Sequence, residues 1–139
     1  MPTPQLAFHL SYDGTCERAF QHYQSVLGGE ITMMMRYSDS PMAGQIPAHQ
    51  QGRIIHASLV LDGQQLMGAD AVEGHPHTGN HGFSVSVTYP TVEEGERVFT
   101  ALGEGGVVIM PFAPTFWAKG FGVLTDRFGV SWMVGGGHM

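Results

Sequence analysis

The sequence has few residues of the kinds that form disulfides, span membranes or bind polyanions. One cysteine, Cys16, stands among 139 residues. An internal disulfide is therefore excluded, and a reducing, cytoplasmic location is expected. No apolar run approaches the ~20 residues that a bilayer-spanning helix needs, and the N-terminus lacks the pattern of a signal peptide. Six Lys and Arg oppose twelve Asp and Glu, for a net charge of −6. Nucleic acid and membranes, which select basic surfaces, are not expected as partners.

The residues that are abundant form short periodic segments separated by twenty glycines. Residues 5–12 alternate between apolar and polar, which predicts a half-buried strand. A helix is predicted next, because apolar residues recur at helical spacing between Cys16 and Leu27. Thr15 is its predicted N-cap, and Gly28 ends it. Three strands follow, at residues 30–37, 54–61 and 64–70, with a long loop at 38–52 and a hairpin turn at Asp62-Gly63.

The same order of elements recurs after a Gly-, Pro- and His-rich linker at residues 72–80. A strand at 82–89 precedes a helix that begins with a capping box, Thr91 to Glu94. Apolar segments then follow at 106–112, 116–124 and 130–134. Shifting the chain by 76 residues superposes Gly29 on Gly105 and Met34 on Met110. The sequence therefore predicts an α+β fold of two βαβββ modules, about 4–71 and 81–136, in one domain of residues 1–139. Their curved mixed sheets are expected to surround a cavity, with the helices outside.

Three segments carry more specific motifs. They are the first helix (GTCERAFQHYQSVLGGE), a strand with a central His and a hairpin ending in Asp (IIHASLVLDGQQLMGAD), and the C-terminal TFWAKGFGVLTDRFGVSWMV. The last contains Phe-Trp-x-x-x-x-Gly and Thr-Asp-x-Phe-Gly-x-x-Trp. Together they resemble the PhnB-like branch of the glyoxalase/bleomycin resistance/dioxygenase (vicinal oxygen chelate) superfamily, over nearly the whole chain. The resemblance implies the glyoxalase/bleomycin resistance fold and a homodimer, because relatives commonly complete their cavities with units from two chains.

Proteins of this branch often carry a 3-demethylubiquinone-9 3-methyltransferase label. A nucleotide-type cofactor site of the common kind needs a Gly-rich turn between an early strand and a helix. The Gly run of this sequence, residues 135–137, lies at the C-terminus with no helix after it. The residues therefore give this label no support as an activity.

The resemblance also implies where a metal would bind. Metal-dependent members place His or Gln and Glu on the first and last strands of each module. In this sequence those positions hold His9, Met67, Ser84 and Met133. A transition-metal site needs at least three protein ligands, so we predict no metal and no cofactor. A divalent metal stays a weakly supported alternative. A rearranged site of His9, His56 and Asp70 would need a bulge, because hairpin parity places Asp70 on the opposite face from His56.

Four of the candidate ligand-binding residues come from the face expected to line the cavity, and Trp117 and Trp132 are candidates for an aromatic wall against a flat or apolar ligand. Alternation places His56 and Ser58 on that face, and the hairpin carries it to Met67. The predicted set is His9, His56, Ser58, Met67, Trp117 and Trp132. His56 is the candidate polar anchor and, in an enzyme, the candidate catalytic residue, because imidazole titrates near neutral pH. Core packing stays open as the alternative for His56, the tryptophans and the methionines.

Other reactive-looking residues have simpler interpretations. His75, His77 and His81 favour a solvated loop over a metal clamp, since Gly and Pro surround them. Asp126 is typical of a turn residue whose side chain caps a bend. Cys16 lies on the apolar stripe of its helix, which favours a buried thiol.

These observations lead to two hypotheses. In the leading one, the protein binds a small organic molecule in a cavity between the modules, without metal. In the alternative, it is a metal-dependent lyase, isomerase or dioxygenase of the glyoxalase type. The sequence does not decide whether the protein is catalytic, and metal analysis would distinguish the two.

Overall fold

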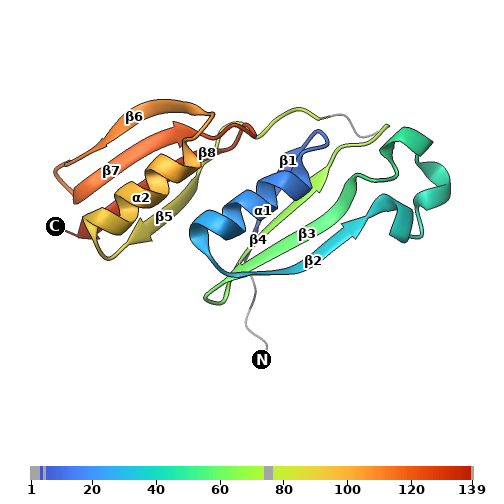
Figure 1. Cartoon of the computed structure of the whole chain (residues 1–139), viewed down its shortest axis with the longest axis horizontal. Helices are drawn as coiled ribbons and strands as arrows, with labels where there is room; N and C mark the ends of the chain where they lie inside the picture. Colours follow the sequence, from blue (N-terminus) through green and yellow to red (C-terminus); the bar gives the residue numbers. More distant parts are fainter. Residues whose placement is uncertain (1–3, 5, 74–76, 139) are drawn as a thin grey trace. The chain divides into compact units, whose positions relative to one another are not determined.

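The computed structural model describes residues 4, 6–73 and 77–138. The chain divides into two compact units, residues 1–79 and 80–139. The first contains β1 (Phe8–Tyr12), α1 (Cys16–Leu27), β2 (Glu30–Arg36), β3 (Ile54–Leu61) and β4 (Gln64–Asp70). The second contains β5 (Val85–Tyr89), α2 (Val92–Leu102), β6 (Val107–Ala113), β7 (Ala118–Thr125) and β8 (Ser131–His138). The predicted order of strand, helix and three strands is confirmed in both units (Figure 1). Neither of these helices, nor any other in the described ranges, is long and apolar enough to cross a membrane.

Each unit is built on a four-stranded mixed sheet. The strand orders are β1-β4-β3-β2 and β5-β8-β7-β6. The pairs β1–β4 and β5–β8 are parallel, and the other neighbours are antiparallel. A parallel pair needs a crossover connection. Here the helix and the two strands that follow it make that connection, so the helix covers one face of its own sheet. We call the opposite face the open face of each unit.

The long loop between β2 and β3 is ordered by its own contacts. It contains three short 3-10 helices, at Tyr37–Asp39, Ala43–Gln45 and Ala48–Gln50. The Gln51 amide donates to the carbonyls of Ala43 (2.6 Å) and Ile46 (2.7 Å). Ile46 packs with Tyr37 and Val72 in a small apolar cluster, against which Ile55 also lies. Side-chain hydrogen bonds and a local cluster therefore hold a segment that has no long helix or strand.

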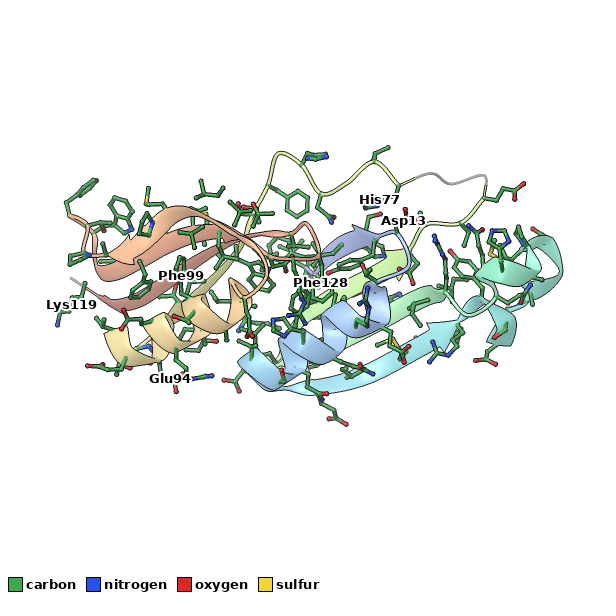
Figure 2. All side chains as sticks on the ribbon, turned by 45° about the horizontal axis from the view of Figure 1, so that its top comes forward. Asp13, His77, Glu94, Phe99, Lys119 and Phe128 are labelled. Carbon is green, nitrogen blue, oxygen red and sulfur yellow. The ribbon has the colours of Figure 1, made fainter. Side chains whose placement is uncertain are left out.

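Close approach of helix to sheet explains the glycines in the strands. The buried stripe of α1 consists of Cys16, Ala19, Phe20, Tyr23 and Val26. A Cβ at Gly68 on β4 would lie 2.7 Å from the Phe20 ring, so only glycine fits beneath it. In the second unit a Cβ at Gly95 of α2 would lie 2.9 Å from the Gly135 carbonyl oxygen. The C-terminal Gly run therefore lies within β8 and lets α2 pack against it. Figure 2 shows Phe99 on the side of α2 toward the sheet and Glu94 on the side away from it.

Asp70, at the end of β4, joins three elements of the first unit. Its carboxylate is only 4% exposed. One oxygen accepts hydrogen bonds from the backbone N–H groups of Gly14 (2.9 Å) and Cys16 (3.0 Å), and the other accepts from Ile54 (2.8 Å). Thr15 was the predicted N-cap of this helix, but its side chain makes no capping hydrogen bond. A carboxylate from a distant strand caps α1 instead, and its negative charge interacts favourably with the positive end of the helix dipole.

Asp126 plays the corresponding part in the second unit. One carboxylate oxygen accepts from the N–H groups of Phe128 and Val130, each at 2.9 Å. The other accepts from the indole N–H of Trp132 at 2.9 Å. The predicted role of Asp126 in capping the bend is confirmed, and the same side chain also holds Trp132. Thr91 caps α2 as predicted, because its hydroxyl accepts from the Glu94 N–H at 3.2 Å.

We predict that Asp70→Asn lowers the free energy of unfolding by about 2 kcal/mol. An amide offers one acceptor oxygen, so at least one buried N–H loses its partner, at a cost of about 1–3 kcal/mol. Urea unfolding followed by circular dichroism measures the change. The matched control is Asp62→Asn in the exposed β3–β4 turn, where φ is 51° and asparagine is well tolerated. Equal effects of the two substitutions would show that Asp70 does not join these elements.

Candidate functional site

The open face of the first unit gathers four of the six predicted ligand-binding residues. Strand pairing places His9 beside Met67, Met67 beside Ser58, and Ser58 beside Met33. These four residues form one row across all four strands, and we call them the His9 row. His56 lies two residues from Ser58 on the same face of β3 and pairs with Met35. Side chains opposite each other on neighbouring strands lie about 4.5–5.5 Å apart at Cβ, so the row is continuous.

A bulge in β2 brings two methionines that the site prediction omitted onto this face. The pairing shifts by one residue between Ile31 and Met33, so Thr32 is the extra residue. Met33 and Met35 then lie opposite Ser58 and His56. Without the bulge, alternation would turn both methionines toward the helix, since one residue of slip exchanges the faces of a strand. Met33 is 42% exposed. Nothing in the local sequence marks the bulge, so simple parity could not find these residues.

The polar groups nearest the His9 row are two imidazoles and a hydroxyl–amide pair. Ser58 is buried at 2% exposure, and its hydroxyl accepts a hydrogen bond from the Gln65 amide at 2.8 Å. Gln65 was absent from the predicted site. Partial burial lowers the pKa of His9, and the neighbouring His56 lowers it further. The His9 row contains no carboxylate, no Lys and no Arg. The row can therefore offer neutral hydrogen-bonding groups and thioether contacts, while the carboxylate on this face belongs to Glu30, paired with Val60 at the start of β2.

The two predicted tryptophans lie in the second unit and differ in exposure. Trp132 is fully buried, pairs with Val85 and Leu124 on the helix side of the sheet, and donates to Asp126. It packs in the core, which was the alternative interpretation. Trp117 is 47% exposed. Its ring meets Phe116 and Phe121 edge-on, at 4.7 and 5.2 Å between centroids. Trp117 is therefore the accessible aromatic of the pair.

The residues at the metal-ligand positions do not fit the divalent site of the superfamily. In the second unit the register pairs Met133 with Ser86, whereas the Ser84 hydroxyl lies 2.6 Å from that of Ser131. These positions therefore offer thioethers and hydroxyls where carboxylates would be needed. Within residues 4, 6–73 and 77–138, no three His, Cys, Asp or Glu side chains are grouped so as to hold a metal.

The rearranged metal site has no support in the geometry either. Asp70 faces α1, and both of its carboxylate oxygens accept hydrogen bonds from backbone N–H groups. It therefore lies on the other face of the sheet from His56, as hairpin parity predicted. Of the loop histidines, His75 lies outside the described residues. His77 contacts the Ser11 hydroxyl through Nδ1 at 3.3 Å, and His81 is exposed. Cys16 is buried, as predicted, and burial raises the pKa of its thiol, with Asp70 adding to the shift.

A polar depression of about 290 Å³ lies at the end of β1, between Asp13 and His77 (Figure 2). The Arg53 guanidinium occupies its wall, donating to the Asp13 carboxylate (2.7 Å) and the Ala71 carbonyl (2.6 Å). Glu73 also lines it. Because the Arg53 guanidinium is already paired with Asp13, this depression offers less to a ligand than the open face does.

We predict that His56 contributes to the lowered pKa of His9. His56→Gln should raise the pKa of His9 part of the way toward its usual value, because one positive charge is removed while the larger cause, burial, remains. The measurement is an NMR titration of the histidine ring signals. The control is His49→Gln, an exposed histidine in the loop. If neither substitution changed the pKa of His9, the two imidazoles would be too far apart to interact.

Comparison with known proteins agrees with this architecture. The family model described as 3-demethylubiquinone-9 3-methyltransferase matches residues 4–135. Protein YjdN of Escherichia coli (strain K12) is 34% identical over an alignment of 137 residues that covers 93% of this chain and 92% of that protein.

Solved structures give the same result. PA1353 from Pseudomonas aeruginosa is 43% identical with a TM-score of 0.89, covering 96% of this chain and 97% of that one. A PhnB protein from Bacillus cereus is 32% identical with a TM-score of 0.77, covering 94% and 97%. In fold alone, the chain is similar to a glyoxalase/bleomycin resistance protein/dioxygenase from Nocardioides, at 18% identity, a TM-score of 0.55 and coverage of 96% and 82%. The chain therefore belongs to the PhnB-like, 3-demethylubiquinone-9 3-methyltransferase family and has the glyoxalase/bleomycin resistance fold.

Proposed function

We propose that this protein binds a small organic molecule on the open face of its first unit, without a tightly bound divalent metal. The observation that supports this most strongly is the His9 row, in which thioethers alternate with an imidazole and a hydroxyl. Ligand sites are mostly apolar, with a few polar groups that fix orientation. Methionine adapts its shape to different ligands, while His56 and the Ser58–Gln65 pair supply the orienting hydrogen bonds.

Two parts of this proposal concern the second unit. The sequence predicts that the ligand is enclosed in a cavity between the units, and that Trp117 adds an aromatic contact. The exposed Trp117, with Phe116 and Phe121 against it, suits a flat or apolar ligand. Trp132 is left out of the proposed contacts because its indole is buried and already bonded to Asp126.

The methyltransferase in the family name is not part of this proposal. A nucleotide-type methyl donor of the common kind is held by a Gly-rich turn between a strand and a helix. Here the Gly run lies inside β8, and its backbone packs under α2 at Gly95. Those glycines therefore have a packing role, and the name supports membership of the family only.

We predict that a panel of small aromatic and aliphatic compounds contains ligands that shift the backbone NMR signals of the His9 row. His56→Ala should weaken the affinity roughly three- to tenfold, the value of a neutral hydrogen bond, with a small change in melting temperature. His49→Ala is the control. A large loss of melting temperature with unchanged affinity would support the alternative, a histidine that packs in the core.

Elemental analysis of the protein purified without added metal distinguishes this proposal from the rival enzyme hypothesis, which requires near-stoichiometric Zn, Fe, Mn or Ni.

We also propose a homodimer. Edge strands and exposed apolar patches are usually buried by association, and a twofold pair is the commonest closed arrangement. The edge strand β6 carries exposed Val107, Val108, Ile109 and Met110. Light scattering over a wide dilution series should give twice the chain mass of 15.0 kDa. A mass of one chain at high protein concentration would contradict the dimer.

A further inference from the structure

The donor atoms on the open face of the first unit have a second chemical use. Met67 lies beside His9 on the adjacent parallel strand and diagonal to His56 across the β3–β4 pair. Diagonal neighbours in a sheet are about 7–8 Å apart, within reach of long side chains. We propose that His9, His56 and Met67 form a binding site for a soft monovalent metal ion, Cu(I) or its analogue Ag(I).

The identity of the ion follows from the donor set. Two imidazole nitrogens and one thioether sulfur carry no charge when they bind a metal. Mg²⁺ and Ca²⁺ require oxygen ligands, mostly carboxylates, and the His9 row has none. Zn²⁺ sites are built from Cys, His, Asp and Glu, and the described residues hold no group of three of these. Thioether sulfur selects Cu(I), and imidazole is a good copper ligand.

The bulge in β2 adds further sulfur beside this site. Met35 lies directly opposite His56, and Met33 lies opposite Ser58. Both thioethers are at least partly exposed. Met35 is therefore the nearest additional thioether, next to His56 on the side away from Met67. This enrichment increases the local concentration of soft ligands.

The second unit provides an internal comparison. There the equivalent row consists of Ser86, Met133, Val123 and Met110. Met133 pairs with Ser86 as Met67 pairs with His9, and both methionines are half-buried. The row of the second unit has thioethers but no imidazole. Met133 is therefore the matched control for Met67.

This inference uses the same face as the proposed ligand site but does not depend on an organic ligand. The compound panel is screened without added metal, so either proposal can fail while the other stands. Neither proposal uses a divalent metal.

The test is a titration of the full-length Cys16→Ala protein with Ag(I) alone, followed in proton–carbon spectra of the methionine methyl groups. The background substitution removes the thiol, which would otherwise compete for Ag(I) in any unfolded chain. We expect saturable binding of one ion per chain, with the Met67 methyl signal shifting and an equal concentration of Zn(II) failing to displace Ag(I).

Two variants locate the site. Met67→Leu conserves volume, so it should fold with a similar melting temperature. It should weaken Ag(I) binding about tenfold or more. Even removing a residue that only hydrogen-bonds to a metal ligand typically lowers metal affinity roughly 10–100-fold. Met133→Leu should leave the affinity unchanged. Absence of saturable binding, equal weakening in both variants, or displacement by Zn(II) would each overturn the proposal.

Discussion

The first unit depends on a single buried carboxylate. Asp70 ends β4, and its two oxygens accept hydrogen bonds from the turn after β1, from the first residue of α1 and from the first residue of β3. These segments are distant in sequence, up to 56 residues apart. A buried carboxylate is costly unless it is fully hydrogen-bonded, so this group is stable only when all three segments are in place. The arrangement sets the direction of α1 over the sheet, and therefore which face stays open.

That constraint explains why the acidic and the soft side chains separate. The helix side of the sheet holds Asp70 with the aromatic core, whereas the His9 row on the open side holds an imidazole, a hydroxyl and two thioethers. A carboxylate within the His9 row would have supplied the oxygen ligand that divalent metal sites prefer. In this protein the side chains of the His9 row favour neutral or soft ligands instead.

The sequence predicts much of this arrangement, because most of it follows from local periodicity. Alternation along β3 and the hairpin at Asp62-Gly63 predict that Ser58 and Met67 share a face, and the register pairs them directly. Two features could not be predicted in this way. The cap of α1 comes from Asp70 rather than from Thr15, since a cap supplied by a distant strand leaves no local pattern. The bulge at Thr32 also leaves none, and it decides where Met33 points.

The two units show how one architecture separates structural from chemical residues. In both, a buried aspartate binds backbone N–H groups at the end of a strand, and glycine allows the helix to approach the sheet closely. The open faces differ at corresponding positions, because His9 and Ser58 of the first unit are replaced by Ser86 and Val123 in the second. Met67 and Met133 are common to both. The methionines therefore suit a shared packing or contact role, and the imidazoles give the first unit its distinct chemistry.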